Sequence, residues 1–150
     1  MNLQEELKTL KERIAELEYH ARKEQEFPQD GDEYWYIDDE GDILNEKWDG
    51  LDFEEYRLEI GNIYKTEDEA EFAVEKLKVE AELRKFSRPF EPMVDNFYMV
   101  LDTSDGSVDI WCMFYSKAEG AIYFESKKKA IEAIESVGEE RVKKYIFGVE

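Results

Sequence analysis

Apolar side chains recur in alternating steps of three and four residues over the first 26 positions of the chain. This spacing predicts an amphipathic helix with the heptad pattern of a coiled coil. Glu6 precedes Lys11 and Arg13 precedes Glu18 at the flanking g and e positions, so a parallel dimer would pair opposite charges between copies. The apolar seam consists of Leu7, Ile14 and Ala21 at the a positions and Leu3, Leu10 and Leu17 at the d positions.

The sequence leaves three partners open for this seam. Three heptads are short, and an isolated helix of that length is marginal in water. The seam therefore predicts a homodimer through residues 3–21, packing on the core of the same chain, or docking onto a foreign partner. Residues 27–32 should end the helix, because Pro28 disfavours helix in the residue before it and Gly31 followed by Asp is typical of a turn. We place a unit boundary here.

Beyond this boundary, one pattern of elements occurs twice. Aromatic and β-branched runs with a turn between them predict hairpins over residues 34–44 and 97–111. Each hairpin leads to a short strand and then a helix, at residues 61–77 and 121–137. Aligning Thr66 with Ser126 places Tyr64 on Phe124 and Ala70 on Ala130, as expected for a duplicated unit.

The predicted fold is therefore α+β, with an N-terminal heptad helix followed by two repeated antiparallel β-hairpin, strand and helix units. Its parts are an arm at residues 1–29, a strongly acidic unit at 30–92, and a second unit at 93–150. The second unit ends in a short helix. Thr66 with Glu69 forms a capping-box pattern, Ser126 is a capping residue, and Gly138 marks a helix end.

Charge is concentrated in one segment. The chain has 39 acidic and 20 basic residues, a net charge of −19, and residues 30–63 alone contribute 13 acidic and two basic residues. A surface this negative repels phosphates, which argues against direct binding of nucleic acid. The carboxylates alternate with aromatic residues, which favours recognition of a basic groove on a partner. The residues assigned to partner binding are Trp35, Tyr36, Asp38, Asp39, Glu40, Asp42, Trp48, Asp49, Asp52, Glu54 and Glu55.

Solubility alone, or a divalent-metal site, would also account for clustered carboxylates. Residues 38–42 and 102–106 both fail the spacing of an EF-hand and are typical of hairpin turns. With one histidine, His20, and one cysteine, Cys112, the chain also lacks the usual partners for nucleophilic catalysis. We expect a solvated His20, a buried structural Cys112, no catalytic residue, no bound metal and no cofactor.

The compartment follows from similar arguments. A single cysteine cannot close an internal disulfide, which favours a reducing compartment. No apolar run approaches about 20 residues, so the sequence predicts neither a signal peptide nor a membrane span. We expect a cytoplasmic protein.

Residues 48–77 resemble a module of small phage and prophage proteins of Gram-positive bacteria. In that module a hairpin with an aromatic strand and a Trp, here Trp48, leads into Gly-Asn, an aromatic residue, Lys-Thr and an acidic run, here residues 61–70. Residues 139–148 are also similar to such proteins. The resemblance implies a phage origin and no catalytic residue; small acidic phage proteins include anti-CRISPR and other anti-defence inhibitors.

Two functions are consistent with these features. The first is a phage-encoded inhibitor of the anti-CRISPR type, acting in the bacterial host cytoplasm. Its acidic face would mimic nucleic acid and occupy the basic groove of a host nucleic-acid-processing protein, such as a CRISPR effector. The alternative is a dimeric adaptor or assembly protein that acts through its N-terminal coiled-coil helix.

Overall fold

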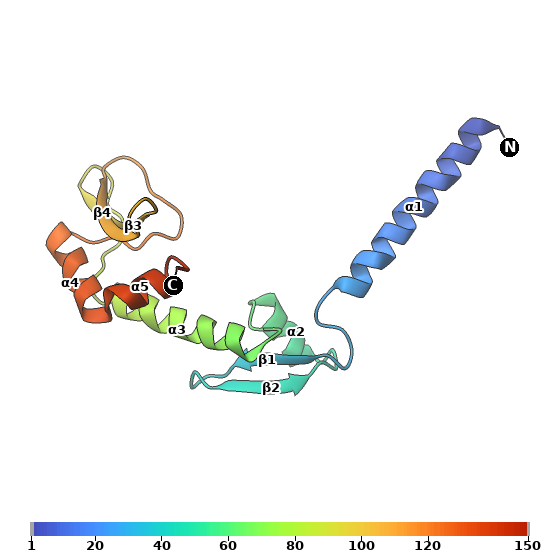
Figure 1. Ribbon diagram of the computed structural model, residues 1–150, viewed down its shortest axis with the longest axis horizontal. Coiled ribbons are helices and arrows are strands. Elements are labelled where there is room, and N and C mark those ends of the chain that lie inside the picture. The colour runs from blue at the N-terminus through green and yellow to red at the C-terminus, as the bar shows by residue number, and fades with distance from the viewer. Residues whose placement is uncertain (1, 150) are drawn as a thin grey trace. The chain divides into compact units, whose positions relative to one another are not determined.

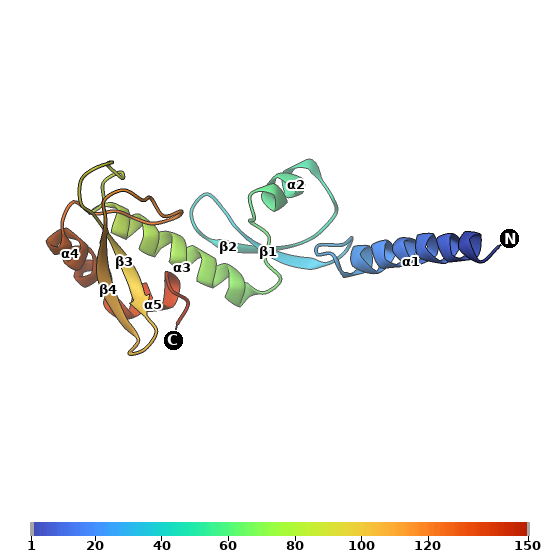
Figure 2. The same ribbon diagram turned by 90° about the horizontal axis from the view of Figure 1, so that it is seen from above.

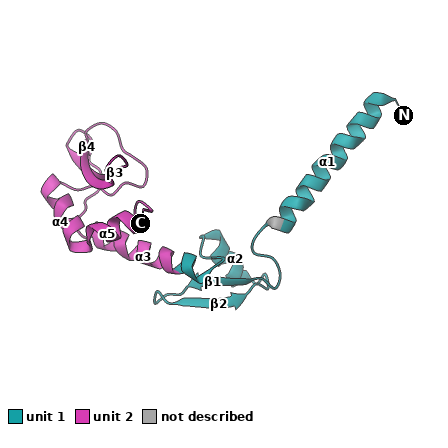
Figure 3. Ribbon diagram, viewed as in Figure 1, with its two compact units in different colours: residues 1–70 teal, residues 71–150 magenta. Residues whose placement is uncertain are grey.

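The computed structural model describes residues 2–149, apart from the side chain of Gln25, and its secondary structure confirms the α+β class (Figure 1). The chain divides into two compact units, residues 1–70 and 71–150 (Figure 3). Over the described residues, none of the helices combines the length and apolar character needed to cross a membrane.

Helix α1 (Leu3–Gln25) starts at a capping box. The Asn2 side chain accepts a hydrogen bond from the backbone N–H of Glu5, and the Glu5 carboxylate accepts one from the backbone N–H of Asn2. Every described side chain of α1 is exposed, including those of the heptad seam. Intramolecular packing, one of the three arrangements left open by the sequence, is therefore not found among the described residues of the first unit.

The first unit is built on a hairpin of β1 (Glu33–Ile37) and β2 (Ile43–Lys47), which are antiparallel and place Trp35 opposite Asn45. Its core consists of Tyr34, Tyr36 and Trp48, with Phe27 and Ile63 packed against them. Helix α2 (Asp52–Glu59) follows the hairpin and was absent from the sequence-based prediction.

Helix α3 (Glu67–Arg84) starts as expected at Thr66, whose hydroxyl accepts a hydrogen bond of 3.1 Å from the backbone N–H of Glu69. Most of this helix serves the second unit, because Val79 and Leu83 are fully buried in that unit's core. The boundary between the two compact units therefore falls within α3, between residues 70 and 71. The sequence-based prediction placed this boundary between residues 92 and 93.

The second unit contains the hairpin of β3 (Asn96–Asp102) and β4 (Ser107–Met113), helix α4 (Lys127–Val137) and helix α5 (Glu139–Tyr145), seen from above in Figure 2. Ser126 caps α4 through a 3.1 Å bond from the backbone N–H of Lys129, and Gly138 ends it with a positive φ of 102°. The core includes Phe124, Ala130, Ala133 and Val142, all fully buried.

The duplication is visible in the backbone pairing of the two hairpins. Trp35 of β1 forms an isolated antiparallel bridge with Tyr64, and Phe97 of β3 forms the equivalent bridge with Phe124. Each bridge has two backbone hydrogen bonds, both 2.9 Å in the first unit and 3.1 and 2.8 Å in the second. The predicted third strand of each repeat is thus a single-residue bridge, two residues before the helix cap.

The two residues singled out for their chemistry have different outcomes. His20 is exposed, as expected. Cys112 is also exposed, so the prediction of a buried thiol is wrong. It lies near the end of β4, an edge strand of a two-stranded sheet, where Trp111 is likewise exposed.

Candidate partner-binding groove

An open pocket of about 610 Å³ in the first unit lies between the turn of the first hairpin and helix α2. We call it the acidic groove. The hairpin contributes residues 36–40 to its lining, and the α2 side contributes Phe53, Tyr56, Arg57, Ile60 and Asn62.

Helix α2 presents an apolar stripe to the groove. Phe53, Tyr56 and Ile60 have the i, i+3, i+7 spacing of one helix face, and they are 48%, 64% and 79% exposed. An apolar helix face normally packs against the core of its own domain. Here it stays open to solvent, which is typical of an interaction surface.

The hairpin turn supplies the negative charge of the groove. One carboxylate oxygen of Asp38 accepts hydrogen bonds from the backbone N–H groups of Glu40 and Asp42, at 3.0 and 2.8 Å, so this side chain holds the turn in shape. Asp39, Glu40 and Asp42 are exposed, and none of them forms an ion pair with another described residue. Their charges are therefore available to a partner.

Asn62 fixes the turn relative to the end of α2. Gly61, with a φ of 76°, ends α2 in a Schellman motif in which the backbone N–H of Asn62 bonds to the carbonyl of Arg57 at 2.8 Å. The Asn62 side chain accepts from the N–H of Ile37 at 2.8 Å and donates to its carbonyl at 2.7 Å. The Asn62 side chain therefore pairs with the outer edge of β1 at Ile37, as the backbone of Tyr64 does at Trp35.

Arg57 lines the groove and is neutralised there. Its Nη1 lies 3.1 Å from a Glu46 carboxylate oxygen and donates to the Tyr34 hydroxyl at 2.8 Å. Its guanidinium carbon lies 3.5 Å from the centre of the Tyr36 ring and 4.9 Å from that of Phe53. A partner entering the groove therefore meets the free carboxylates of the turn and not an unpaired cation.

Glu54 links the hairpin to α2 and is almost completely buried, with 1% exposure. It accepts hydrogen bonds from the Tyr34 hydroxyl at 2.6 Å and from the backbone N–H groups of Asp49 and Leu51 at 3.0 and 3.2 Å. Burial opposes its ionisation, but these bonds together with Arg57 outweigh burial and hold the pKa of Glu54 below its ordinary value. Burial, and then the bond to Glu54, raise the pKa of Tyr34.

The structure brings only some of the predicted binding residues to the groove. Asp38, Asp39, Glu40 and Tyr36 line it, although Tyr36 is only 7% exposed. Of the other predicted binding residues, Trp35 is half-buried. Four more are exposed but do not line the groove, namely Asp42, Asp49, Asp52 and Glu55.

Three of the predicted binding residues do not suit that role. Tyr36 and Trp48 belong to the core of the first unit, and Glu54 is turned inward, so these side chains hold the unit together. Tyr36 borders the groove but offers a partner only 7% of its surface. Sequence reasoning missed Phe53, Tyr56 and Ile60 as site residues. Their helical spacing was the signal that could have identified them.

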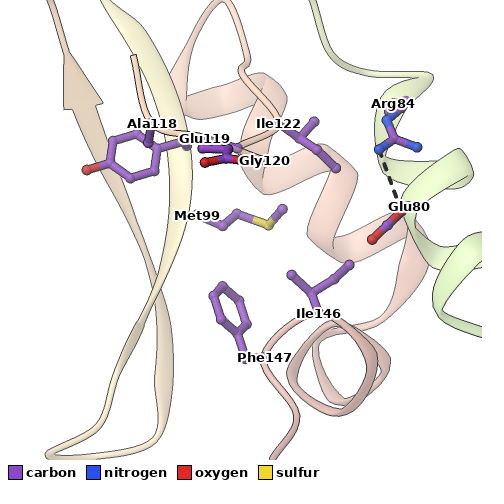
Figure 4. A pocket seen from close by; sticks show the side chains of 11 residues that line it. Glu80, Arg84, Met99, Ala118, Glu119, Gly120, Ile122, Ile146 and Phe147 are labelled. Atoms are coloured by element: carbon purple, nitrogen blue, oxygen red, sulfur yellow. Dashed lines mark ion pairs between the residues drawn. The ribbon is translucent and has the colours of Figure 1, made fainter. Parts of the chain in front are cut away.

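The second unit has smaller pockets. One, of about 290 Å³, is lined by apolar side chains including Met99, Ile146 and Phe147, and the Glu80–Arg84 ion pair of 3.5 Å lies at its side (Figure 4). Another, of about 420 Å³, is bordered by Arg84, Arg88 and Lys117. Arg88 donates to the Asn96 side chain and to the carbonyls of Pro89 and Asp95, so its donors are engaged within the unit.

Among residues 2–149, no three or more His, Cys, Asp or Glu side chains are grouped in a way that could hold a metal ion. In comparisons with known proteins, no family model, no curated protein and no solved structure matches this chain. The geometry of the groove is therefore the basis for a functional proposal.

Proposed function

We propose that this chain is a phage-type inhibitor that binds a basic, nucleic-acid-binding surface of a host bacterial protein through the acidic groove. The observation that carries the proposal is that exposed apolar side chains of α2 and unpaired carboxylates of the hairpin turn lie along one groove. The apolar stripe supplies contact area, and the carboxylates select cationic partners.

The charge around the groove favours a strongly basic partner. Nine of the 13 acidic residues between positions 30 and 63 are exposed. Of the 13 acidic residues, Glu46 is the one that forms an ion pair with another described residue, Arg57. A partner whose Lys and Arg residues normally bind phosphates would be attracted to this surface, and the complex would weaken as salt rises.

Two of the ionisable groups with perturbed pKa values serve the structure of the first unit and carry no argument for catalysis. Tyr34 and Glu54 have clearly shifted pKa values, but both are in the interior of the first unit. Burial is the main cause of the raised pKa of Tyr34, and hydrogen bonds together with Arg57 lower the pKa of Glu54 against the effect of its burial. The resemblance of residues 48–77 to phage proteins supports a host bacterial partner, with a CRISPR effector as one candidate.

A pull-down from bacterial lysate tests the proposal. The tagged full chain is incubated at roughly 50 and roughly 500 mM salt, since surface electrostatics are screened at the higher value. We expect a basic nucleic-acid-binding protein to be retained at low salt and lost at high salt. The captured protein is then loaded with fluorescent DNA or RNA, and the chain should displace that nucleic acid.

Two matched variants locate the surface. The triple variant Asp39→Asn, Glu40→Gln, Asp42→Asn removes three exposed carboxylates of the turn and leaves Asp38, which shapes the turn, in place. The control Glu91→Gln, Glu125→Gln, Glu135→Gln removes three exposed carboxylates of the second unit. We expect the turn variant to weaken binding by about tenfold or more and the control to change it little. Equal loss in both variants would show that net charge alone matters.

A dimeric adaptor is the second candidate, because the heptad seam of α1 is exposed along its length. The variant Leu10→Lys, Leu17→Lys separates the two functions. Loss of partner capture with an intact acidic groove supports the adaptor, whereas capture that depends on the turn carboxylates but not on the seam supports the inhibitor.

A further inference from the structure

We propose that α1 binds the α1 helix of a second copy of this chain as a parallel two-stranded coiled coil. This inference is independent of the proposed inhibitor function, which rests on the acidic groove, and it concerns the same α1 seam as the adaptor candidate. The proposed seam consists of Leu3, Leu7, Leu10, Ile14, Leu17 and Ala21.

The seam is uncovered in the single chain. The large side chains of the seam are exposed by 83% at Leu3, 53% at Leu7, 60% at Leu10, 54% at Ile14 and 51% at Leu17. Most helical stability in proteins comes from the packing of an apolar face, and α1, a helix of 23 residues, packs none of its described side chains within the chain. A second copy offers the same stripe at the same spacing, which is the complement that knobs-into-holes packing requires.

Charges beside the seam favour the parallel orientation. In a parallel dimer each g residue faces the following e residue of the other copy. Glu6 then meets Lys11 of the second copy, and Arg13 meets Glu18 of the second copy. In the single chain Arg13 bonds to Glu16 at 3.0 Å, but both side chains are more than half exposed. This i,i+3 pair is therefore weak and can exchange for an interchain pair.

The antiparallel orientation brings like charges together. In an antiparallel dimer, residues at the a positions of one helix pack against residues at the d positions of the other, so Leu7 lies opposite Leu17 of the second copy. The residues beside the seam then pair g with g and e with e. Arg13 then faces Arg13 of the second copy, and Lys11 faces Lys11. Two like-charged pairs at the middle of the seam oppose this arrangement.

The seam is limited to three heptads, because Glu24 occupies the d position that follows Ala21. A coiled coil this short dissociates on dilution. We therefore expect a reversible monomer–dimer equilibrium, with the helical circular dichroism signal of α1 falling as the full chain is diluted.

Sedimentation equilibrium of the full chain tests the dimer. The variant Leu10→Lys, Leu17→Lys places charges in the seam and should weaken the dimer by at least about a hundredfold. The control Ala15→Lys, Tyr19→Lys adds the same charge at exposed positions outside the seam and should dimerise like the parent. Near-ultraviolet circular dichroism verifies that both variants keep folded units. A parent chain that stays monomeric at hundreds of micromolar, or a seam variant that still dimerises, overturns the proposal.

Charge exchange and crosslinking test the orientation. Glu6→Lys alone should weaken the dimer, and adding Lys11→Glu should restore it, because the pair is exchanged between copies. In a Cys112→Ser background, Leu3→Cys should form an interchain disulfide on mild oxidation, since parallel helices bring the two positions together. Failure of the second substitution to restore dimerisation, or failure of Leu3→Cys to crosslink, excludes the parallel arrangement.

Discussion

The hydroxyl of Tyr34 donates a 2.6 Å hydrogen bond to the buried carboxylate of Glu54, joining strand β1 to helix α2 inside the first unit. The same carboxylate holds the backbone N–H groups of Asp49 and Leu51, so it also forms the N-terminal cap of α2. Arg57, one turn further along, donates to the hydroxyl of Tyr34. One buried anion therefore positions the helix that carries the apolar side of the acidic groove.

Glu54→Ala should destabilise the first unit strongly. The change leaves the hydroxyl of Tyr34 and two backbone N–H groups without their acceptor, so we expect a loss of about 2–3 kcal/mol in the free energy of unfolding. Urea unfolding followed by the fluorine NMR signal of Trp48, in a chain labelled with fluorotryptophan, measures it. Glu55→Ala, at the exposed neighbouring position, is the control and should cost less than about 0.5 kcal/mol. Similar losses in both variants would contradict the structural role of Glu54.

The stability of the first unit should fall in acid through Glu54. Because its pKa is lowered in the folded chain, ionised Glu54 contributes fully above its ordinary pKa of 4.5, and this contribution is lost as pH falls through the folded pKa. Urea unfolding of the parent and of Glu54→Gln, measured from neutral to strongly acidic pH, gives the comparison. We expect a smaller decline below pH 4.5 in the variant. Parallel curves would show that other carboxylates govern the acid transition.

The sequence predicted the repeated architecture because its signals are local. Helix caps such as Thr66 and Ser126 bond within three residues, and the hairpins follow from alternating strands with Gly and Asp turns. The alignment of Tyr64 with Phe124 is confirmed by their equivalent bridges to the first strand of each hairpin.

The acidic groove could be predicted only in part, because long-range packing decides which side chains are exposed. Alternating carboxylates and aromatics suggested one exposed face, but Glu54 and Trp48 are buried by contacts with Tyr34, 20 and 14 residues away in sequence. Helix α2 was missed because it is only eight residues long and keeps its apolar stripe outside the core. The unit boundary was misplaced because α3 follows the first repeat in sequence while its Val79 and Leu83 pack in the second core.

Asn62→Ala should loosen the acidic turn without unfolding the hairpin. The variant removes both hydrogen bonds to the backbone of Ile37, and we expect a loss of about 1–2 kcal/mol. Hydrogen exchange at the amide of Ile37 should become at least about tenfold faster, because that N–H loses its partner. Asn45→Ala is the control and should leave the exchange of Ile37 unchanged, since Asn45 is exposed and its side chain donates one hydrogen bond of 3.2 Å, to the carbonyl of Tyr34. Unchanged protection of Ile37 would mean that the β1–β2 ladder alone holds the turn.

Asn96 occupies in the second repeat the position of Tyr34 in the first, immediately before the bridging residue, and both are fully buried. Its amide oxygen accepts from Arg88 and from the backbone N–H of Glu91, and its amide nitrogen donates to the carbonyls of Glu91, Val94 and Met113. Asn96→Ala should therefore cost the second unit about 2 kcal/mol.

The effect of Asn96→Ala should be confined to the second unit, because the two units have separate cores, one around Tyr34 and Trp48 and the other around Phe124 and Leu83. Fluorine-labelled tryptophan resolves the two, since Trp35 and Trp48 lie in the first unit and Trp111 in the second. We expect Asn96→Ala to lower the urea midpoint of the Trp111 signal and to leave the midpoint of the Trp48 signal unchanged. Glu54→Ala should lower the midpoint of Trp48 and leave that of Trp111 unchanged. If both signals moved together in both variants, the shared helix α3 would couple the units into one cooperative domain, and the two repeats would be parts of a single folding unit.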